Sequence, residues 1–161
     1  MGGQLVGLNL LIQHSTPQLA VGTVHRDQYG RRFTYGQFNG AHTAGRWSIK
    51  TSETFDMTPM TTTLCGTPGT NWKELGIACC DGTDNYYGWF FTGFGEFEAI
   101  IENGYAAADV LYTTANAGIP GTNSSSFIID GVKTIDAGVT GTRVTIVASG
   151  ALTAGLTAAH D

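Results

Sequence analysis

Alternation of apolar and polar positions is strongest in the middle of the chain, between residues 86 and 131. Three runs there are rich in β-branched and aromatic residues: Tyr86–Ile101, Val110–Thr114 and Phe127–Ile129. Each run is followed by turn residues, among them Asn-Gly, Pro-Gly and Asp-Gly pairs. Such runs, bounded by such pairs, are typical of β-strands joined by turns. The pattern predicts three strands, with Asp130-Gly131 as the turn that follows the third.

The first run is apolar on both faces. Successive side chains of a strand point to opposite sides, so Tyr87, Trp89 and Phe91 share one face and Tyr86 and Phe90 the other. The domain's own core would cover one face, and either its own loops or another subunit would cover the second. Tyr87, Trp89 and Phe91 are therefore candidates for a core or for a subunit contact. The glycines at 88, 93 and 95 predict bulges or bends where the sheet curls.

The segments on either side add further β-structure. Ala20–Val24 and Arg32–Tyr35 predict a hairpin. Additional short strands are expected at Trp47–Ile49, Ile77–Cys80 and Thr142–Val147. The Thr-rich stretch 50–71 contains Pro59 and Pro68 and is expected to be a loop or a ragged edge. Residues 72–77 are expected to be a helical turn or an irregular step. The chain is thus predicted to be all-β, with a single β domain over residues 17–150.

The two ends of the chain differ from this domain. The first sixteen residues have poor helical periodicity and three glycines, and their apolar positions are Leu5, Val6, Leu8, Leu10, Leu11 and Ile12. Residues 1–16 are therefore expected to be an extended arm. An arm this apolar is expected to pack on its own barrel, on a sister subunit or on another protein. Residues 151–161 are small and are expected to form a flexible tail.

Composition and charge reduce the number of possible functions. The chain has 161 residues, enough for one domain with a real core, and only 13% of them are charged, against about 25% in ordinary soluble proteins. A neutral, β-rich surface tends to associate, so partners are expected to cover part of it, although a soluble β domain that tolerates low charge is the alternative. The net charge of −5 and the lack of a basic run argue against nucleic acid. No apolar stretch reaches the ~20 residues of a membrane span.

Candidate chemistry is sparse. His25 and Asp27 form either a catalytic pair or solvated charges at a hairpin turn. Glu96 and Glu98 share one face of a strand, as in a paired-carboxylate glycosidase or as in an ordinary polar face. Cysteines occur at 65, 79 and 80 without a CxxC spacing, which favours reduced thiols over disulfides or a zinc site, and the adjacent pair is expected to be buried. We therefore expect no enzyme activity, no metal and no cofactor.

Several segments resemble one known family. They are Tyr87-Gly88-Trp89, the run Leu111–Gly118 (LYTTANAG) and Ile129-Asp130-Gly131, preceded by Leu19–Thr23, Tyr29–Tyr35 and the small-residue step Ala41–Gly45. Together these segments resemble the head decoration, or cement, proteins of tailed bacteriophages. The Thr-rich stretch 50–71 and the apolar first sixteen residues depart from that pattern.

The resemblance implies a compact β-barrel or β-tulip-like domain that is commonly a homotrimer. It also implies a protein that is made in the host cytoplasm and lies on the outer surface of the capsid in the virion. It implies that the arm residues Leu5 to Ile12 contact the major capsid protein and that the domain stabilises the assembled lattice. A receptor- or glycan-binding module of a phage tail or fibre is the alternative, with Trp47, Trp72 or Trp89 on an exposed platform. Decoration predicts buried aromatic residues, whereas glycan binding predicts a solvent-facing tryptophan.

Overall fold

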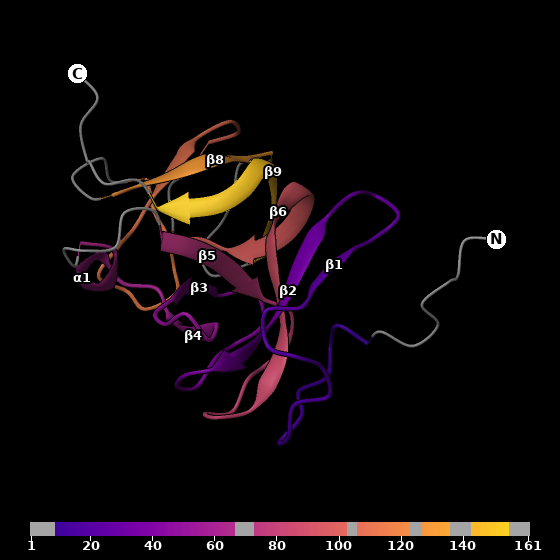
Figure 1. The fold of residues 1–161 in the computed structure, drawn as a ribbon. Coiled ribbons are helices and arrows are strands. Elements are labelled where there is room, and N and C mark those ends of the chain that lie inside the picture. Colours follow the sequence, from indigo (N-terminus) through magenta and orange to yellow (C-terminus); the bar gives the residue numbers. More distant parts are fainter. Residues whose placement is uncertain (1–8, 67–72, 103–105, 123–126, 136–142, 155–161) are drawn as a thin grey trace.

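The computed structural model describes residues 9–66, 73–102, 106–122, 127–135 and 143–154 (Figure 1). Within these ranges the regular secondary structure is almost entirely β, which confirms the all-β prediction. The elements in chain order are β1 (Val24–Arg26), β2 (Arg32–Phe38), β3 (Trp47–Lys50), β4 (Asp56–Pro59), α1 (Thr62–Cys65), β5 (Lys73–Ala78), β6 (Tyr87–Ile100), β7 (Val110–Tyr112), β8 (Ile128–Thr134) and β9 (Arg143–Ala154).

Five strands close into a ring. The sheet runs β1-β2-β4-β3-β5-β6-β9-β8-β7, and an additional pairing joins β6 back to β2. The ring β2-β4-β3-β5-β6 is therefore a small barrel. Its pairings are antiparallel except for β2 with β4, where Gln37 lies opposite Asp56 in a parallel pair. The expected hairpin is present as β1 and β2, although its first strand begins at Val24 rather than at Ala20.

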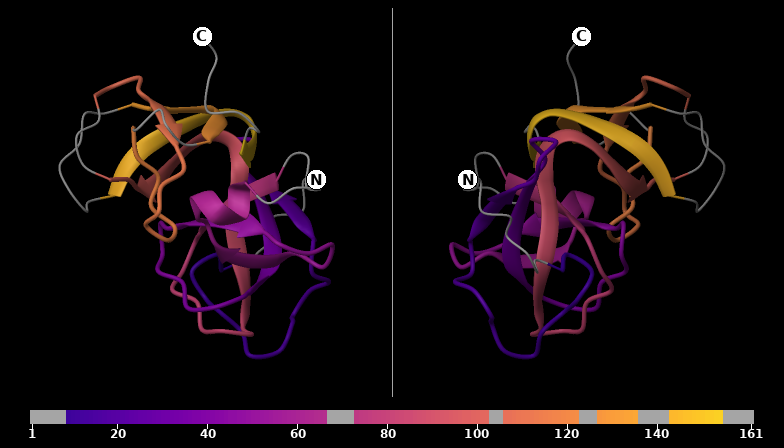
Figure 2. Two further views of the ribbon diagram at one scale, coloured as in Figure 1. Left: turned by 90° about the vertical axis from the view of Figure 1, so that its left-hand side faces the viewer. Right: turned by 90° about the vertical axis from the view of Figure 1, so that its right-hand side faces the viewer.

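The second half of β6 leaves the barrel and joins a four-stranded wing. We use this name for β6 from Gly95 onward together with β9, β8 and β7. Figure 2 shows β6 running up through the molecule and curving over beside β9. In the wing Glu96 lies opposite Val147 and Glu98 opposite Thr145, and β8 continues the sheet beyond β9. The wing therefore extends from a strand that the barrel also uses.

The bend in β6 depends on glycine. The register between β6 and β9 shifts between Gly93 and Gly95, which confirms the bend expected there. Gly93 has φ of 136°, and a Cβ on it would lie 2.1 Å from the carbonyl oxygen of Gly150. Only a residue without a side chain fits this close crossing. Gly88 has a different role, since its missing Cβ makes room for the ring of Phe38.

Both faces of β6 are covered within one chain. The larger core cluster includes Trp89 and Phe91, with Tyr87 partly buried against it. The other face carries Phe90, which packs in a second cluster with Phe38, Met57, Ala78 and Cys80. Members of this second cluster come from several strands of the ring and pack around Gly36 and Gly76, where an added Cβ would lie within about 3 Å of Met57 side-chain atoms. The second cluster therefore fills the narrow barrel.

The stretch 50–71 contains two regular elements, so the prediction of a loop was wrong for Asp56–Pro59 and Thr62–Cys65. It contains β4, which pairs with both β2 and β3, and α1, whose first turn is capped by the Thr61 hydroxyl accepting from the Leu64 N–H at 3.2 Å. Residues 73–77, expected to be irregular, belong to β5. Threonine and proline signalled a loop, but strand pairing with distant partners decided the structure. Pro59 fits because it ends its strand.

Two further boundaries differ from the sequence-based expectation. Asp130-Gly131 is a bulge inside β8 and not a turn, since Gly131 takes a φ of 70° while the strand continues to Thr134. β9 continues to Ala154, into the segment expected to be a flexible tail, because Ala151–Ala154 pair with β5, β6 and β8. Local composition does not reveal either pairing. Residues 155–161 lie outside the described residues.

Candidate interaction site

The N-terminal segment is held to the barrel at its end nearest β1. His14 exchanges two backbone hydrogen bonds with Tyr87, both of 2.8 Å, and so continues the edge of β6. Gln13 accepts from the Thr83 N–H at 2.7 Å and donates to its hydroxyl at 3.2 Å. Leu10 packs against the main core, whereas Leu11 is 72% exposed and Ile12 46% exposed. The segment is thus anchored, yet it presents two large apolar side chains to solvent. Leu5, Val6 and Leu8 lie outside the described residues.

The tryptophans that the structure describes are buried. Trp47 is fully buried and Trp89 is 4% exposed, and both belong to the main core. Trp72 lies outside the described residues. Tyr87 stacks on Tyr35 with ring centroids 6.4 Å apart, and Trp89 packs on the same ring at 5.2 Å. These aromatic side chains therefore hold β6 to β2, and Trp47 and Trp89 do not offer a surface platform.

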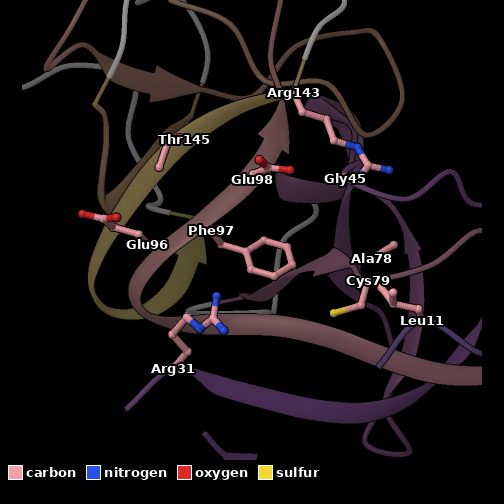
Figure 3. Close-up of a pocket in the computed structure, with 10 residues that line it drawn as sticks. All are labelled: Leu11, Arg31, Gly45, Ala78, Cys79, Glu96, Phe97, Glu98, Arg143 and Thr145. Atoms are coloured by element: carbon pink, nitrogen blue, oxygen red, sulfur yellow. The ribbon is translucent and has the colours of Figure 1, made fainter. Parts of the chain in front are cut away.

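A hollow of about 440 Å³ lies on the concave side of the bend in β6 (Figure 3). Phe97 points into it and stacks on Phe91 with ring centroids 4.5 Å apart. Leu11 lies at one end, near Ala78 and Cys79. The hollow therefore has an apolar floor supplied by the core and an apolar rim supplied by the N-terminal segment.

A second hollow of about 370 Å³ adjoins the first. Tyr29, Arg31, Gly95 and Glu96 line it, and it shares Arg31 and Glu96 with the first hollow. Tyr29 is 73% exposed, and with Leu11 it is the most exposed of the large apolar side chains that the structure describes. We call the two hollows together the bend groove. The most exposed apolar side chains thus lie at its opposite ends.

Charged side chains line the groove between these ends. Arg31 donates from Nε to Asp27 at 2.6 Å, and its guanidinium lies 5.7 Å from the centre of the Phe33 ring. Partial burial alone would raise the pKa of Asp27, but hydrogen bonds from Arg31 and from the Tyr29 N–H hold that pKa below its ordinary value. Arg31 is therefore fixed by its own carboxylate partner.

The remaining charges of the groove are less constrained. Arg143 donates from Nη2 to the carbonyl oxygen of Ala44 at 3.4 Å. Glu96 and Glu98 are exposed, and neither forms an ion pair within the described part of the chain. Figure 3 shows Glu96 pointing away from the hollow that Phe97 enters. The two carboxylates share the solvent-facing side of the wing, as alternation predicted.

The other candidate reactive groups are engaged elsewhere. His25 packs edge-on against Trp89 at 6.2 Å, while Asp27 bonds to Arg31, so the suggested His–Asp pair is not formed. Burial, with the adjacent Cys80, raises the pKa of Cys79 far above its ordinary value. Burial and the charge of Asp81 raise the pKa of Cys80 to about 11. Both cysteines are buried, as expected, and neither thiol is activated as a nucleophile.

The described residues carry neither a metal-binding cluster nor a membrane-spanning helix. Among those residues no three His, Cys, Asp or Glu side chains lie close enough together to hold a metal ion. None of the helices that the structure describes has the length and hydropathy of a membrane span. No protein-family model matches the chain, and no curated protein is significantly similar to it.

The bend groove was not anticipated from the sequence, although its signals are present. The spacing of Gly93 and Gly95 predicted the bend, and the apolar pattern of the arm included Leu11. Nothing local to either segment indicated that the bend would place Phe97 close to Arg31 and Cys79. The groove arises from residues that are far apart in sequence.

Proposed function

We propose that the chain is a structural virion protein that decorates the capsid of a tailed bacteriophage and stabilises its assembled lattice. The partners would be the major capsid protein and, in a homotrimer, further copies of the chain itself, on the outer surface of the capsid. The proposal rests on the sequence resemblance, on the neutral β-rich surface and on one structural observation. That observation is the N-terminal segment, which is anchored at His14 while Leu11 and Ile12 remain exposed.

Leaving that segment exposed to water costs free energy that docking on a partner would recover. Leu11 and Ile12 are large aliphatic side chains, and burying each one fully would contribute about 1.5–3 kcal/mol. Hydrogen bonds at Gln13 and His14 fix the direction of the chain directly before them. A pre-ordered apolar segment loses little conformational entropy on binding. Most of the free energy gained by burying it therefore contributes to affinity. The segment is therefore suited to docking on another protein.

The alternative, a receptor- or glycan-binding module, has less support. It predicted a tryptophan on the surface, and Trp47 and Trp89 are both buried. The large exposed aromatic side chain among the described residues is Tyr29, which lies at the bend groove beside Arg31.

Co-sedimentation with assembled heads tests the proposal. Purified protein is mixed with heads of the parent phage and, separately, with unassembled capsid protein. We expect it to pellet with heads and to raise their melting temperature, because a ligand that binds the assembled state alone stabilises that state. Leu11→Asp with Ile12→Asp should abolish pelleting. Val24→Asp is the matched control, since Val24 is also 46% exposed but lies in β1. Failure of the wild-type protein to bind heads would refute the proposal.

A further inference from the structure

One edge of β6 is unpaired where the strand borders the bend groove. From Gly95 to Ile100 the strand pairs with β9 along one edge only. Its pairing with β2 has ended at Gly93, and its pairing with β5 covers only Phe90 and Phe91. The opposite edge of residues 95–99 therefore faces the groove without a neighbouring strand.

The hydrogen bonds of Ile100 show which backbone groups point toward this edge. The Ile100 N–H donates to the carbonyl oxygen of Gly45 at 2.8 Å, away from β9. In an antiparallel pair alternate residues direct both backbone groups away from the partner strand. The register with β9 is continuous from Gly95 to Ile100, so Glu98 and Glu96 direct their N–H and C=O groups to the same side as Ile100. Within the described part of the chain, neither a strand pairing nor a backbone hydrogen bond outside the strands supplies a partner for these four groups.

An extended peptide would satisfy this edge. Unpaired strand edges are templates for strand addition, in which main-chain hydrogen bonds supply affinity and alternate side chains supply specificity. Gly45 already occupies the position beside Ile100, so an added strand would continue along the edge beside Glu98 and Glu96. Leu11 and Tyr29, at the two ends of the groove, would contact the flanking residues of such a segment.

The side chains of the edge define the sequence of the occupant. Residues opposite Glu96 and Glu98 would lie on the same face as the two carboxylates, which have no ion-pair partner in the described residues, so basic side chains fit there. Arg143, on β9, offsets only part of this negative charge, and Arg31 is already paired with Asp27. The intervening residue would point to the opposite face, against Phe97, and is expected to be apolar.

We propose that the bend groove binds an extended segment of a partner protein by strand addition to Glu96 and Glu98, and that this segment has the pattern basic–apolar–basic. The apolar arm of a second copy does not fit this pattern, because residues 1–16 contain no Lys or Arg. The inference does not depend on the proposed capsid role, since it specifies the chemistry of a segment and not the protein that carries it.

Amide hydrogen exchange followed by NMR tests the edge in the full-length protein. In the free protein the N–H groups of Phe97 and Ala99 should exchange slowly, because they point to β9, while those of Glu96 and Glu98 exchange rapidly. Adding the peptide acetyl-GSKVKSG-amide should protect the Glu96 and Glu98 amides. Equal protection of all four amides in the free protein would overturn the proposal. Protection that rises with protein concentration alone would assign the edge to a second copy and would also overturn it.

Charge variants test the predicted sequence of the occupant. The peptide acetyl-GSEVESG-amide should bind at least tenfold more weakly than the lysine peptide, because like charges directly opposite on neighbouring strands repel. The double variant Glu96→Lys with Glu98→Lys should reverse this preference. Glu53→Lys, in the exposed connection between β3 and β4, is the matched control and should change neither affinity by more than about twofold. Equal binding of both peptides to the wild-type protein would refute the basic–apolar–basic pattern.

Discussion

Replacing Gly93 by alanine should disrupt the bend that joins barrel and wing. Two effects add at this position. A φ of 136° is strained for any residue with a side chain, which costs about 1–3 kcal/mol. The new Cβ would also lie 2.1 Å from the carbonyl oxygen of Gly150 and 2.8 Å from the Cα of Ala151. These are backbone atoms of β9 that cannot rotate away, and overpacking of this kind costs about 1–3 kcal/mol more.

The expected destabilisation is therefore about 2–6 kcal/mol, a large part of the ~5–15 kcal/mol that stabilises an ordinary domain. Urea unfolding checks it, because the buried Trp47 and Trp89 report the transition by fluorescence. Substitutions at two other glycines separate the contribution of backbone strain from that of steric overlap. Gly30→Ala, at φ of 79° with open space around it, should cost only about 1–2 kcal/mol of backbone strain. Gly150→Ala, at ordinary φ and also in open space, should change stability by less than about 0.5 kcal/mol.

The ranking of the three variants is the critical result. If Gly93→Ala were no more destabilising than Gly30→Ala, the close crossing of β6 and β9 would not constrain the strand. Steric exclusion of a side chain at position 93 would then not be the cause of the bend. If Gly150→Ala were as destabilising as Gly93→Ala, the space around position 150 could not be open.

Other properties can be checked separately. Burial lowers the pKa of His42, so the folded state favours the neutral ring. The contribution of His42 to stability is fully present above the unfolded pKa of about 6.5 and is lost as the pH falls through the lower pKa of the folded state. The urea midpoint should therefore decline from pH 7.5 to 5.5, and His42→Asn should flatten that decline; an unchanged slope would contradict the assignment. Cys79 and Cys80 should react with a thiol reagent only after unfolding, and fast labelling of the native protein would contradict their burial. Deleting residues 2–16 should abolish attachment to heads while leaving the unfolding transition of the barrel cooperative, and normal attachment would rule out the arm. Light scattering should give the mass of a trimer, and a monomer at micromolar concentration would argue strongly against the proposed assembly.

The parts of the fold that the sequence predicted are those that local patterns control. β6, with its dense alternation of aromatic residues, was placed within one residue at each end. β4 was missed, and β5 was predicted only at its end, since the strand expected at Ile77–Cys80 overlaps it at Ile77 and Ala78. The threonines, glycine and proline of these segments carry weak local signals, and their strand character comes from pairing with β2, β3 and β6.

The candidate site was harder to predict for the same reason. The apolar arm could be recognised from composition, and the bend from Gly93 and Gly95. The free edge at Glu96 and Glu98 depends on β2 ending its pairing at Gly93 while β9 continues along the other side. An unpaired edge is a property of the whole topology, and no window of sequence records it.

The pairing of β5 with β9 has a consequence for how the chain folds during synthesis. Lys73 lies opposite Ala154 and Glu74 opposite Thr153, so along this edge the first residues of β5 pair with the last strand that the structure describes. The chain is made from its N-terminus, and contacts so distant in sequence form late and slowly. While the ribosome is still adding β9, the barrel strands already exist, but one edge of β5 remains open to other nascent chains. Completion of the last strand closes that edge, so a chain truncated before Ala151 should be prone to aggregation even though every strand of the barrel is present.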